Sequence, residues 1–219
     1  MLKSDPRAPT VGKPFARHSY DPQAALQEFA DAGWKRGEDG RMVNVVGEAA
    51  RIELRGGPVE GTEVALMADS WRQLGIDAAE EIASVTLARD NEYQATFPAL
   101  ALRAYRSNAE LFPVFDSRAQ STAQNRWQGL NYSHYVNPAL DSLTDMLYAT
   151  TDERQQGQLL KELGEILATD LPALPAYFRV LMAAVTKDVN ALVEDYAGGT
   201  GPGSGPGLLS RNAYLWDRR

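Results

Sequence analysis

Aromatic, amide and guanidinium side chains gather between residues 104 and 135, in a stretch with neither helical nor strand periodicity. Small-molecule sites use such side chains, because rigid aromatic walls bury a ligand and a few amides and charges orient it. Loops held by a rigid scaffold also carry binding residues more often than cores do. The candidates for ligand binding are Tyr105, Arg106, Asn108, Arg126, Trp127, Asn131 and Tyr132. The alternative is that these residues only pack the loop onto neighbouring helices.

Catalytic chemistry has much weaker support in the sequence. A serine nucleophile would need His18 or His134 as its base, and no serine stands in a G-x-S-x-G elbow. The acidic pairs at 80–81 and 152–153 are typical of solvated surfaces. His134 has no second ligand at metal-binding spacing, and the glycine run at 198–207 lacks the phosphate-binding patterns. The sequence therefore predicts no catalytic residue, no metal site and no cofactor.

Composition narrows the class of protein further. The chain has 219 residues, 44% hydrophobic and 23% charged, as expected for a domain that buries a core. Its net charge of -7 and pI near 4.9 argue against nucleic acid as a partner. No run approaches the roughly 20 apolar residues that span a bilayer. Residues 1–30 lack the apolar core of a signal peptide, so we expect a chain that is neither inserted nor self-targeting.

The elements that must position the candidate residues are clearest between Asn131 and Val185. Asn137 followed by a proline predicts a capped helix with leucines on one face. Thr150 and Glu153 have the spacing of a capping box for a second helix. This second helix should end at 170–172, where a proline disfavours helical geometry in the residue before it. An almost continuous apolar run at 177–185 then predicts a buried strand, with a buried helix as the alternative that periodicity leaves open.

Residues 21–102 predict alternating helices and strands. Asp21 and Pro22 begin a helix, and Gly33-Trp34 predicts a Schellman ending for it. The hydrophobic pattern then predicts a parallel βαβ unit, with Trp71 on the apolar stripe of its helix and therefore in the core. A short helix and a further strand should follow. The predicted ranges are strand 50–55, helix 62–74, strand 76–82, helix 85–93 and strand 95–102.

Several motifs, taken in order, resemble one family. They are Tyr20-Asp21-Pro22 followed by Gly33-Trp34, Trp71 to Ile76, Asn131-Tyr132 with Asn137 to Asp141, Asp170-Leu171-Pro172, and Asn212 to Trp216. This succession is similar to the C-terminal part of the extracellular solute-binding proteins of family 5, the dipeptide-, oligopeptide- and nickel-binding components of ABC importers. Members of that family are about twice as long, with an N-terminal lobe and an export signal ahead of the matched region.

The resemblance implies one lobe of an α/β, class II periplasmic-binding-protein-like fold, with a mixed sheet flanked by helices. It implies a lead or linker at 1–20, a C-terminal ligand-binding lobe at 21–185, and a glycine- and proline-rich tail at 186–219 that returns to the missing N-terminal lobe. It implies a non-enzymatic protein at the periplasmic or extracellular face of a bacterial membrane. The implied partners are a peptide or similar small solute, the N-terminal lobe and the ABC permease. A second lobe headed by a signal peptide is expected upstream in the coding DNA.

One departure concerns the ligand. In peptide-binding members an aspartate after the strand that corresponds to 95–102 pairs with the amino terminus of the ligand. Here the loop at 104–110 has no matching aspartate, and Glu110 is the acidic residue that could replace it. Arg106 or Arg126 would instead suit an anionic group. Two other functions stay open at this point: a hydrolase-type α/β enzyme, and a protein-interaction module whose partner covers the tail.

Overall fold

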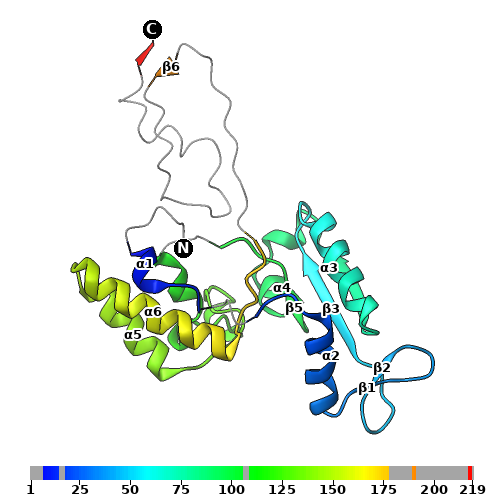
Figure 1. The fold of residues 1–219 in the computed structure, drawn as a ribbon. Coiled ribbons are helices and arrows are strands. Elements are labelled where there is room, and N and C mark those ends of the chain that lie inside the picture. The colour runs from blue at the N-terminus through cyan, green and yellow to red at the C-terminus, as the bar shows by residue number, and fades with distance from the viewer. Residues whose placement is uncertain (1–6, 15–17, 106–108, 178–188, 191–216, 219) are drawn as a thin grey trace. The chain divides into compact units, whose positions relative to one another are not determined.

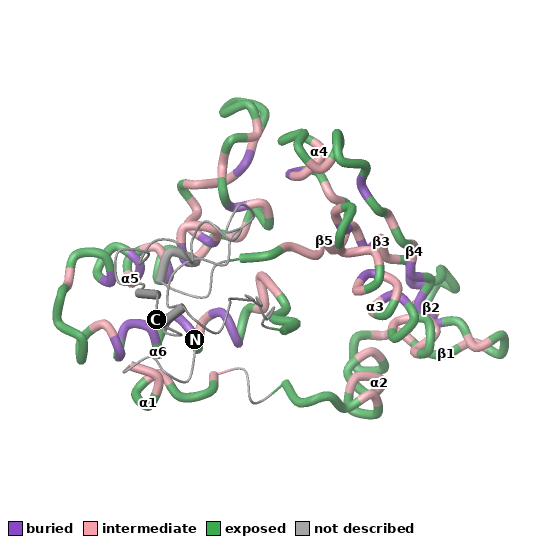
Figure 2. Tube along the Cα trace, turned by 90° about the horizontal axis from the view of Figure 1, so that it is seen from above, coloured by how far each residue is buried: buried purple, intermediate pink, exposed green. Residues whose placement is uncertain are grey.

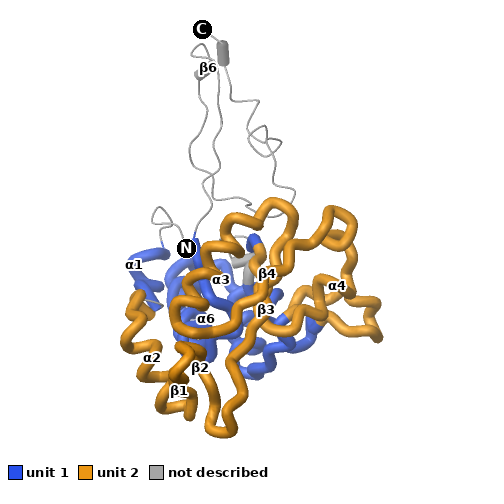
Figure 3. The backbone as a smooth tube through the Cα atoms, turned by 90° about the vertical axis from the view of Figure 1, so that its right-hand side faces the viewer, with its two compact units in different colours: residues 1–15, 104–120, 133–219 blue, residues 16–103, 121–132 orange. Residues whose placement is uncertain are grey.

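The structure is a computed structural model that describes residues 7–14, 18–105, 109–177, 189–190 and 217–218. The chain divides into two compact units (Figures 1 and 3). Unit 1 comprises 1–15, 104–120 and 133–219, and unit 2 comprises 16–103 and 121–132. Within the described part of the chain, every helix is too short or too polar to cross a bilayer.

Unit 2 is built on a parallel three-stranded sheet of order β4-β3-β5, with α3 as the crossover between β3 and β4 (Figure 1). The register pairs Arg51 with Asp77 and Leu54 with Leu100. This arrangement confirms the predicted parallel βαβ unit. The elements of unit 2 are α2 (Pro22–Asp31), β1 (Lys35–Arg36), β2 (Met42–Val43), β3 (Arg51–Gly56), α3 (Gly61–Gln73), β4 (Asp77–Ile82), η2 (Leu87–Arg89), α4 (Asn91–Ala95), β5 (Leu100–Ala101) and η5 (Ala123–Asn125).

The core of unit 2 lies between α3 and the sheet. Val64 and Ala68 of α3 are fully buried against Leu54 of β3 and Ala78 of β4. A second cluster holds Met42, Ala50 and Ile76, with Trp34 and Trp71 packed on it. Trp71 is therefore a core residue, as its place on the apolar stripe predicts. Burial of this kind is the main favourable term in folding.

Two helices of unit 2 end in the same way. The Trp34 N–H donates to the Phe29 carbonyl (2.8 Å), and the Gly33 N–H donates to that of Ala30 (3.0 Å), which is the predicted Schellman motif. At the end of α3, the Ile76 N–H donates to the Trp71 carbonyl (3.2 Å). The glycine in each turn has a positive φ, 87° at Gly33 and 89° at Gly75. A glycine tolerates this backbone because it has no Cβ.

The segment at 85–102 differs from the prediction. The expected helix at 85–93 is a short 3-10 turn, η2, followed by α4, which Asp90 caps by accepting from the Tyr93 N–H (2.7 Å). The expected strand at 95–102 is reduced to the two residues of β5. Two residues are too few for alternation to identify a strand, so the sequence pattern placed its start too early.

Unit 1 is centred on α5 and α6, which lie side by side (Figure 1). Both carry rows of buried residues (Figure 2), and Leu140 and Leu163 are completely buried between them. The short helix α1 packs on α6, where Gly157 leaves room for Thr10 and Gly164 leaves room for Pro14. The elements are α1 (Ala8–Val11), η3 (Ala109–Val114), η4 (Ser117–Ala119), α5 (Pro138–Ala149), α6 (Glu153–Asp170), β6 (Val189–Asn190) and β7 (Asp217–Arg218).

The start of α6 corrects one prediction. Asp152, not Thr150, caps the helix, because its carboxylate accepts from the Gln155 N–H (2.7 Å). A carboxylate at this position also interacts favourably with the positive end of the helix dipole. Thr150 supports the turn from further out, where its hydroxyl accepts from the Asp152 N–H (3.2 Å). The helix ends as predicted at Leu171, although with a left-handed φ of 49°.

Other predictions fall mostly outside the described residues. Tyr177 is exposed, and the remainder of the predicted strand at 177–185 is not among the described residues. The predicted strand-like end at 212–216 is likewise outside them. The described residues of the tail form one antiparallel pair, β6 with β7. In the lead at 1–20, where little periodicity was expected, α1 is a formed helix.

Candidate functional site

The carboxyl end of the sheet in unit 2 carries an arginine stacked on a tyrosine. Arg55, near the end of β3, lies 4.1 Å above the centroid of the Tyr93 ring and donates to the Tyr93 carbonyl (2.8 Å) and to Glu53 (2.9 Å). The Tyr93 hydroxyl in turn donates to Glu81 of β4 (3.0 Å). Burial, and then the hydrogen bond to Glu81, raise the pKa of Tyr93. These contacts hold α4 across the ends of two strands.

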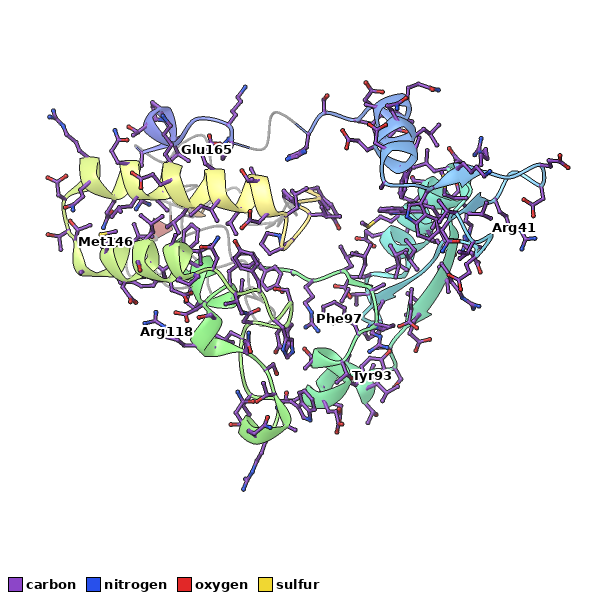
Figure 4. The ribbon with its side chains drawn as sticks, turned by 90° about the horizontal axis from the view of Figure 1, so that it is seen from below. Arg41, Tyr93, Phe97, Arg118, Met146 and Glu165 are labelled. Atoms are coloured by element: carbon purple, nitrogen blue, oxygen red, sulfur yellow. The ribbon has the colours of Figure 1, made fainter. Side chains whose placement is uncertain are left out.

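A second arginine stacks at the end of the neighbouring strand. Arg103 follows β5, and its guanidinium lies 4.1 Å from the centroid of the Tyr132 ring and 5.7 Å from that of Phe97. It also donates to the side chain of Gln94 (3.0 Å) and to the Gln94 backbone carbonyl. Tyr93 and Phe97 lie close together on the segment that contains α4 (Figure 4). Arg103 therefore joins this segment to the loop at 121–132 of the same unit.

That loop, which we call the 121–132 loop, is fixed by its own hydrogen bonds. The Thr122 N–H donates to the side chain of Asn125 (3.0 Å), and the Thr122 carbonyl accepts from the Trp127 N–H (2.8 Å). At the base of the loop, the Ser121 N–H donates to the Asn131 carbonyl (3.1 Å). Ser121 and Asn131 are both completely buried. A loop so braced presents its outer side chains in a defined geometry.

Backbone strain is concentrated at the outer turn of the loop. Arg126 and Trp127 both have left-handed backbones, with φ of 57° and 58°. A residue with a Cβ is uncommon in this region, and strained residues cluster at functional sites. Arg126 is exposed and Trp127 is half-buried.

The structure places the predicted site residues unequally. Tyr132 stacks under Arg103, whereas Asn131 is buried and supports the loop from within. Tyr105 is 37% exposed and belongs to unit 1. Arg106 and Asn108 lie outside the described residues. Of the predicted set, Arg126, Trp127, Asn131 and Tyr132 share one loop of unit 2.

Sequence reasoning missed the arginines that hold this region together. Arg103 directly follows the strand that the hydrophobic pattern predicts at 95–102. In parallel sheets, ligands usually bind beyond the carboxyl ends of the strands. This position was the signal that could have identified it. Arg55 had no such signal, because its contacts with Tyr93 come from a segment 38 residues away.

In unit 1, Asn137 and Asp170 of the family-like motifs have structural roles. The side-chain oxygen of Asn137 accepts from the N–H groups of Ala139 (3.0 Å) and Leu140 (3.2 Å), which caps α5 as predicted. Its amide group donates to Asp170 at the end of α6 (3.1 Å) and to the Tyr135 hydroxyl (2.9 Å). The Tyr135 hydroxyl also donates to Asp170. Burial, and then this bond to Asp170, raise the pKa of Tyr135 to about 12.

A carboxylate-rich contact fastens η4 to α5. Arg118 donates to Asp116 (2.6 Å) and to Asp145 of α5 (2.8 Å), and it lies beside that helix (Figure 4). These hydrogen bonds lower the pKa of both aspartates. Asp141 accepts from the N–H (3.0 Å) and from the hydroxyl of Ser117. Asp141 is therefore occupied with holding the chain in place.

Other possible centres in the described residues are poorly equipped for chemistry. No group of three histidine, cysteine or carboxylate side chains there could hold a metal ion. A hollow of about 450 Å³ in unit 2 is lined by Arg41, Arg72 and Asp77 among others. Its arginines are already paired, Arg41 with Asp39 (2.6 Å) and Arg72 with Glu80 (2.8 Å). The 121–132 loop with Arg103 is thus the better candidate for ligand contact.

Comparison with known proteins identifies the fold. No protein-family model and no curated protein matches the sequence. Among solved structures, the chain is similar to NikZ from Campylobacter jejuni in complex with Ni(L-His), at 18% identity and a TM-score of 0.66, over 91% of this chain and 39% of that one. It is similar to the oligopeptide-binding protein from Thermus thermophilus complexed with a pentapeptide, at 23% identity and a TM-score of 0.67, over 82% of this chain and 32% of that one. It is also similar to the periplasmic EDTA-binding protein EppA, at 18% identity and a TM-score of 0.59, over 79% of this chain and 32% of that one.

These likenesses define the class of fold. The chain has the α/β fold found in part of the periplasmic solute-binding proteins of ABC importers, as the motifs predicted. The chain covers 39% of the length of NikZ and 32% of the length of each of the other two proteins. Other solved structures with this fold are described as an oligopeptide ABC transporter protein from Thermotoga maritima and a nickel ABC transporter protein from Bacillus halodurans.

Proposed function

We propose that the chain is the C-terminal lobe of the substrate-binding component of an ABC-type importer. The proposal rests on the similarity in fold, which extends over 91% of this chain in the comparison with NikZ and over 82% in the comparison with the Thermus protein. The partial coverage of those chains supports a second lobe in the whole protein, and their periplasmic class supports a location outside the cytoplasmic membrane. The peptide or similar solute would be captured by closure of the two lobes and delivered to the permease.

The mechanism follows from differential affinity. A solute that contacts both lobes binds the closed form more tightly than the open form, so it shifts the population towards closure. The permease then recognises the closed shape. Of the seven candidates, we propose Arg126, Trp127 and Tyr132 as the residues of the described chain that face or flank the solute. Tyr105, Arg106 and Asn108 remain proposals, and Asn131 would act by supporting the loop.

The ligands of the similar proteins bear on the substrate class. NikZ is described with a nickel–histidine complex, the Thermus protein with a pentapeptide, and EppA as an EDTA-binding protein. We propose a small polar solute of that kind for this chain.

The test is the identity and fate of the bound molecule. Mass spectrometry of the full-length protein, purified without denaturation, is expected to detect one small solute per chain, released unchanged on unfolding. Residues 1–219 alone should bind that solute poorly in calorimetry, because half of the contact surface is absent. Tight one-to-one binding by the chain alone would contradict two-lobed capture, and conversion of the solute would favour an enzyme.

A further inference from the structure

We infer that the outer turn of the 121–132 loop recognises a carboxylate or similar anionic group of the solute, with Arg126 as the specificity-determining residue and Trp127 as a stacking wall. The inference rests on the proposed solute-binding function and adds the charge of the ligand to it.

The guanidinium of Arg126 is available to a ligand. The arginines of β3 and α3 have acidic partners: Arg55 binds Glu53, Arg72 binds Glu80, and Arg51 lies 3.6 Å from Asp77. Arg126 is exposed and has no ion pair or hydrogen bond to its guanidinium within the described residues. An unpaired guanidinium is a planar, permanently charged fork suited to a carboxylate.

The backbone at the outer turn of the 121–132 loop is strained. Two successive residues with a Cβ, Arg126 and Trp127, are held at φ of 57° and 58°. Hydrogen bonds of Thr122 and Asn125 impose this conformation on them. Because left-handed backbone is costly for such residues, a turn needed only to connect two segments would use glycine. The strain instead fixes where the guanidinium and the indole project.

The base of the 121–132 loop is buried and anchored to the end of β5. The Ser121 side chain is completely buried, and its hydroxyl has no hydrogen-bond partner in the described structure. A buried polar group without a partner is uncommon and calls for an explanation. Tyr132, next to the buried Asn131, is stacked on Arg103 at the end of β5. The loop is therefore anchored at the carboxyl end of β5, and ligands of parallel sheets usually bind beyond the carboxyl ends of the strands.

Aromatic and charged groups divide the recognition between them. Trp127 offers an apolar face with limited rotational freedom, which suits the body of a small solute. Arg126 then selects for the anion at one end of that solute. Bidentate contact is lost with lysine, whose ammonium is a point charge. The physical consequence is a preference for an acid over its neutral amide.

The experiment follows the indole N–H resonance of Trp127 by NMR in the chain of residues 1–219, assigned with Trp127→Phe. The probes are N-acetyl-trialanine and N-acetyl-trialaninamide, which differ only in a carboxylate against an amide. The acid is expected to shift the resonance at millimolar concentration and to bind about tenfold more tightly than the amide, as for one charge-assisted pair. Arg126→Gln should abolish the preference, Arg126→Lys should weaken it, and high salt should reduce it.

Arg89→Gln is the matched control, because Arg89 is another exposed arginine of unit 2. It should leave the preference unchanged, and the backbone spectrum of each variant reports whether it is folded. Equal binding of acid and amide, or a preference that survives Arg126→Gln, would overturn the carboxylate inference alone and leave solute binding intact. No shift with either peptide would overturn the inference alone, because solute capture by two lobes is tested separately on the full-length protein.

Discussion

Replacement of Gly75 by alanine should destabilise unit 2 strongly. Gly75 ends α3 with a φ of 89°, and its carbonyl accepts from the Met42 N–H (2.8 Å). A Cβ built there would lie 2.4 Å from the Gly40 carbonyl oxygen and 3.1 Å from the Met42 nitrogen. These neighbours are backbone atoms and cannot rotate away. The substitution therefore forces a shift of the turn that carries Gly40.

The magnitude has two parts. Left-handed backbone costs a residue with a Cβ roughly 1–2 kcal/mol. Overpacking a tight site costs typically about 1–3 kcal/mol more. Together they predict a loss of roughly 2–5 kcal/mol in the free energy of unfolding. With a urea m-value of roughly 1–3 kcal/mol/M, the midpoint should fall by on the order of 1 M or more.

The assay is urea unfolding followed by tryptophan fluorescence. Trp34 and Trp71 are suitable reporters, because both pack on the cluster that includes Ile76, the residue after Gly75. Gly61→Ala is the matched control: Gly61 begins α3, and a Cβ there would meet no atom within 4 Å. It should be neutral or stabilising by about 0.4–1 kcal/mol. Equal urea midpoints for Gly75→Ala and Gly61→Ala would show that the turn at Gly75 accommodates a Cβ without loss of stability.

Three further predictions concern unit 1. Asn137→Ala should lower the free energy of unfolding by about 1–2 kcal/mol, because the cap of α5 is lost. Asn137→Asp should keep the cap oxygen but place a second carboxylate beside Asp170, which it repels. Hydrogen exchange of the α5 amides measures both effects, and equal protection in the wild type and Asn137→Ala would contradict the capping role. Arg118 lowers the pKa of Asp116 and Asp145, so their contribution to the free energy of unfolding is present above pH 3.8 and is lost as the pH falls below this value. In Arg118→Gln the urea midpoint should therefore fall less steeply with decreasing pH than in the wild type. An acid dependence equal to that of the wild type would contradict this role of Arg118. The pKa of Tyr135 is raised from 10.0 to about 12, so its contribution to the free energy of unfolding is present below pH 10 and is lost towards pH 12. Tyr135→Phe should remove this loss of stability at alkaline pH. A loss that persists in the variant would come from another group.

Local signals in the sequence predicted local structure well. Asp21 and Asn137 cap the helices that they were predicted to cap, and Gly33 and Gly75 end helices as predicted, because each signal acts within one turn of chain. The cap of α6 was misassigned because Thr150 and Asp152 are both acceptable caps, and only the start of the helix decides between them.

Long-range contacts were less predictable. The stacking of Arg103 on Tyr132 joins residues that only the fold brings together, so no spacing rule could identify it. Asn131 was chosen by type as a possible ligand contact, yet packing buries it completely. Residue type thus identified the loop, while burial and stacking distinguish its outer residues from its inner ones. The two-residue strand β5 was equally beyond a periodicity argument.

The most direct test of solute capture is native mass spectrometry of the full-length protein alongside the chain of residues 1–219. We expect one small solute bound per full-length chain, released unchanged on unfolding, and a much weaker complex with residues 1–219 alone. A full-length protein that retains no solute after exposure to a broad solute mixture, or a solute that leaves the protein chemically altered, would contradict solute capture.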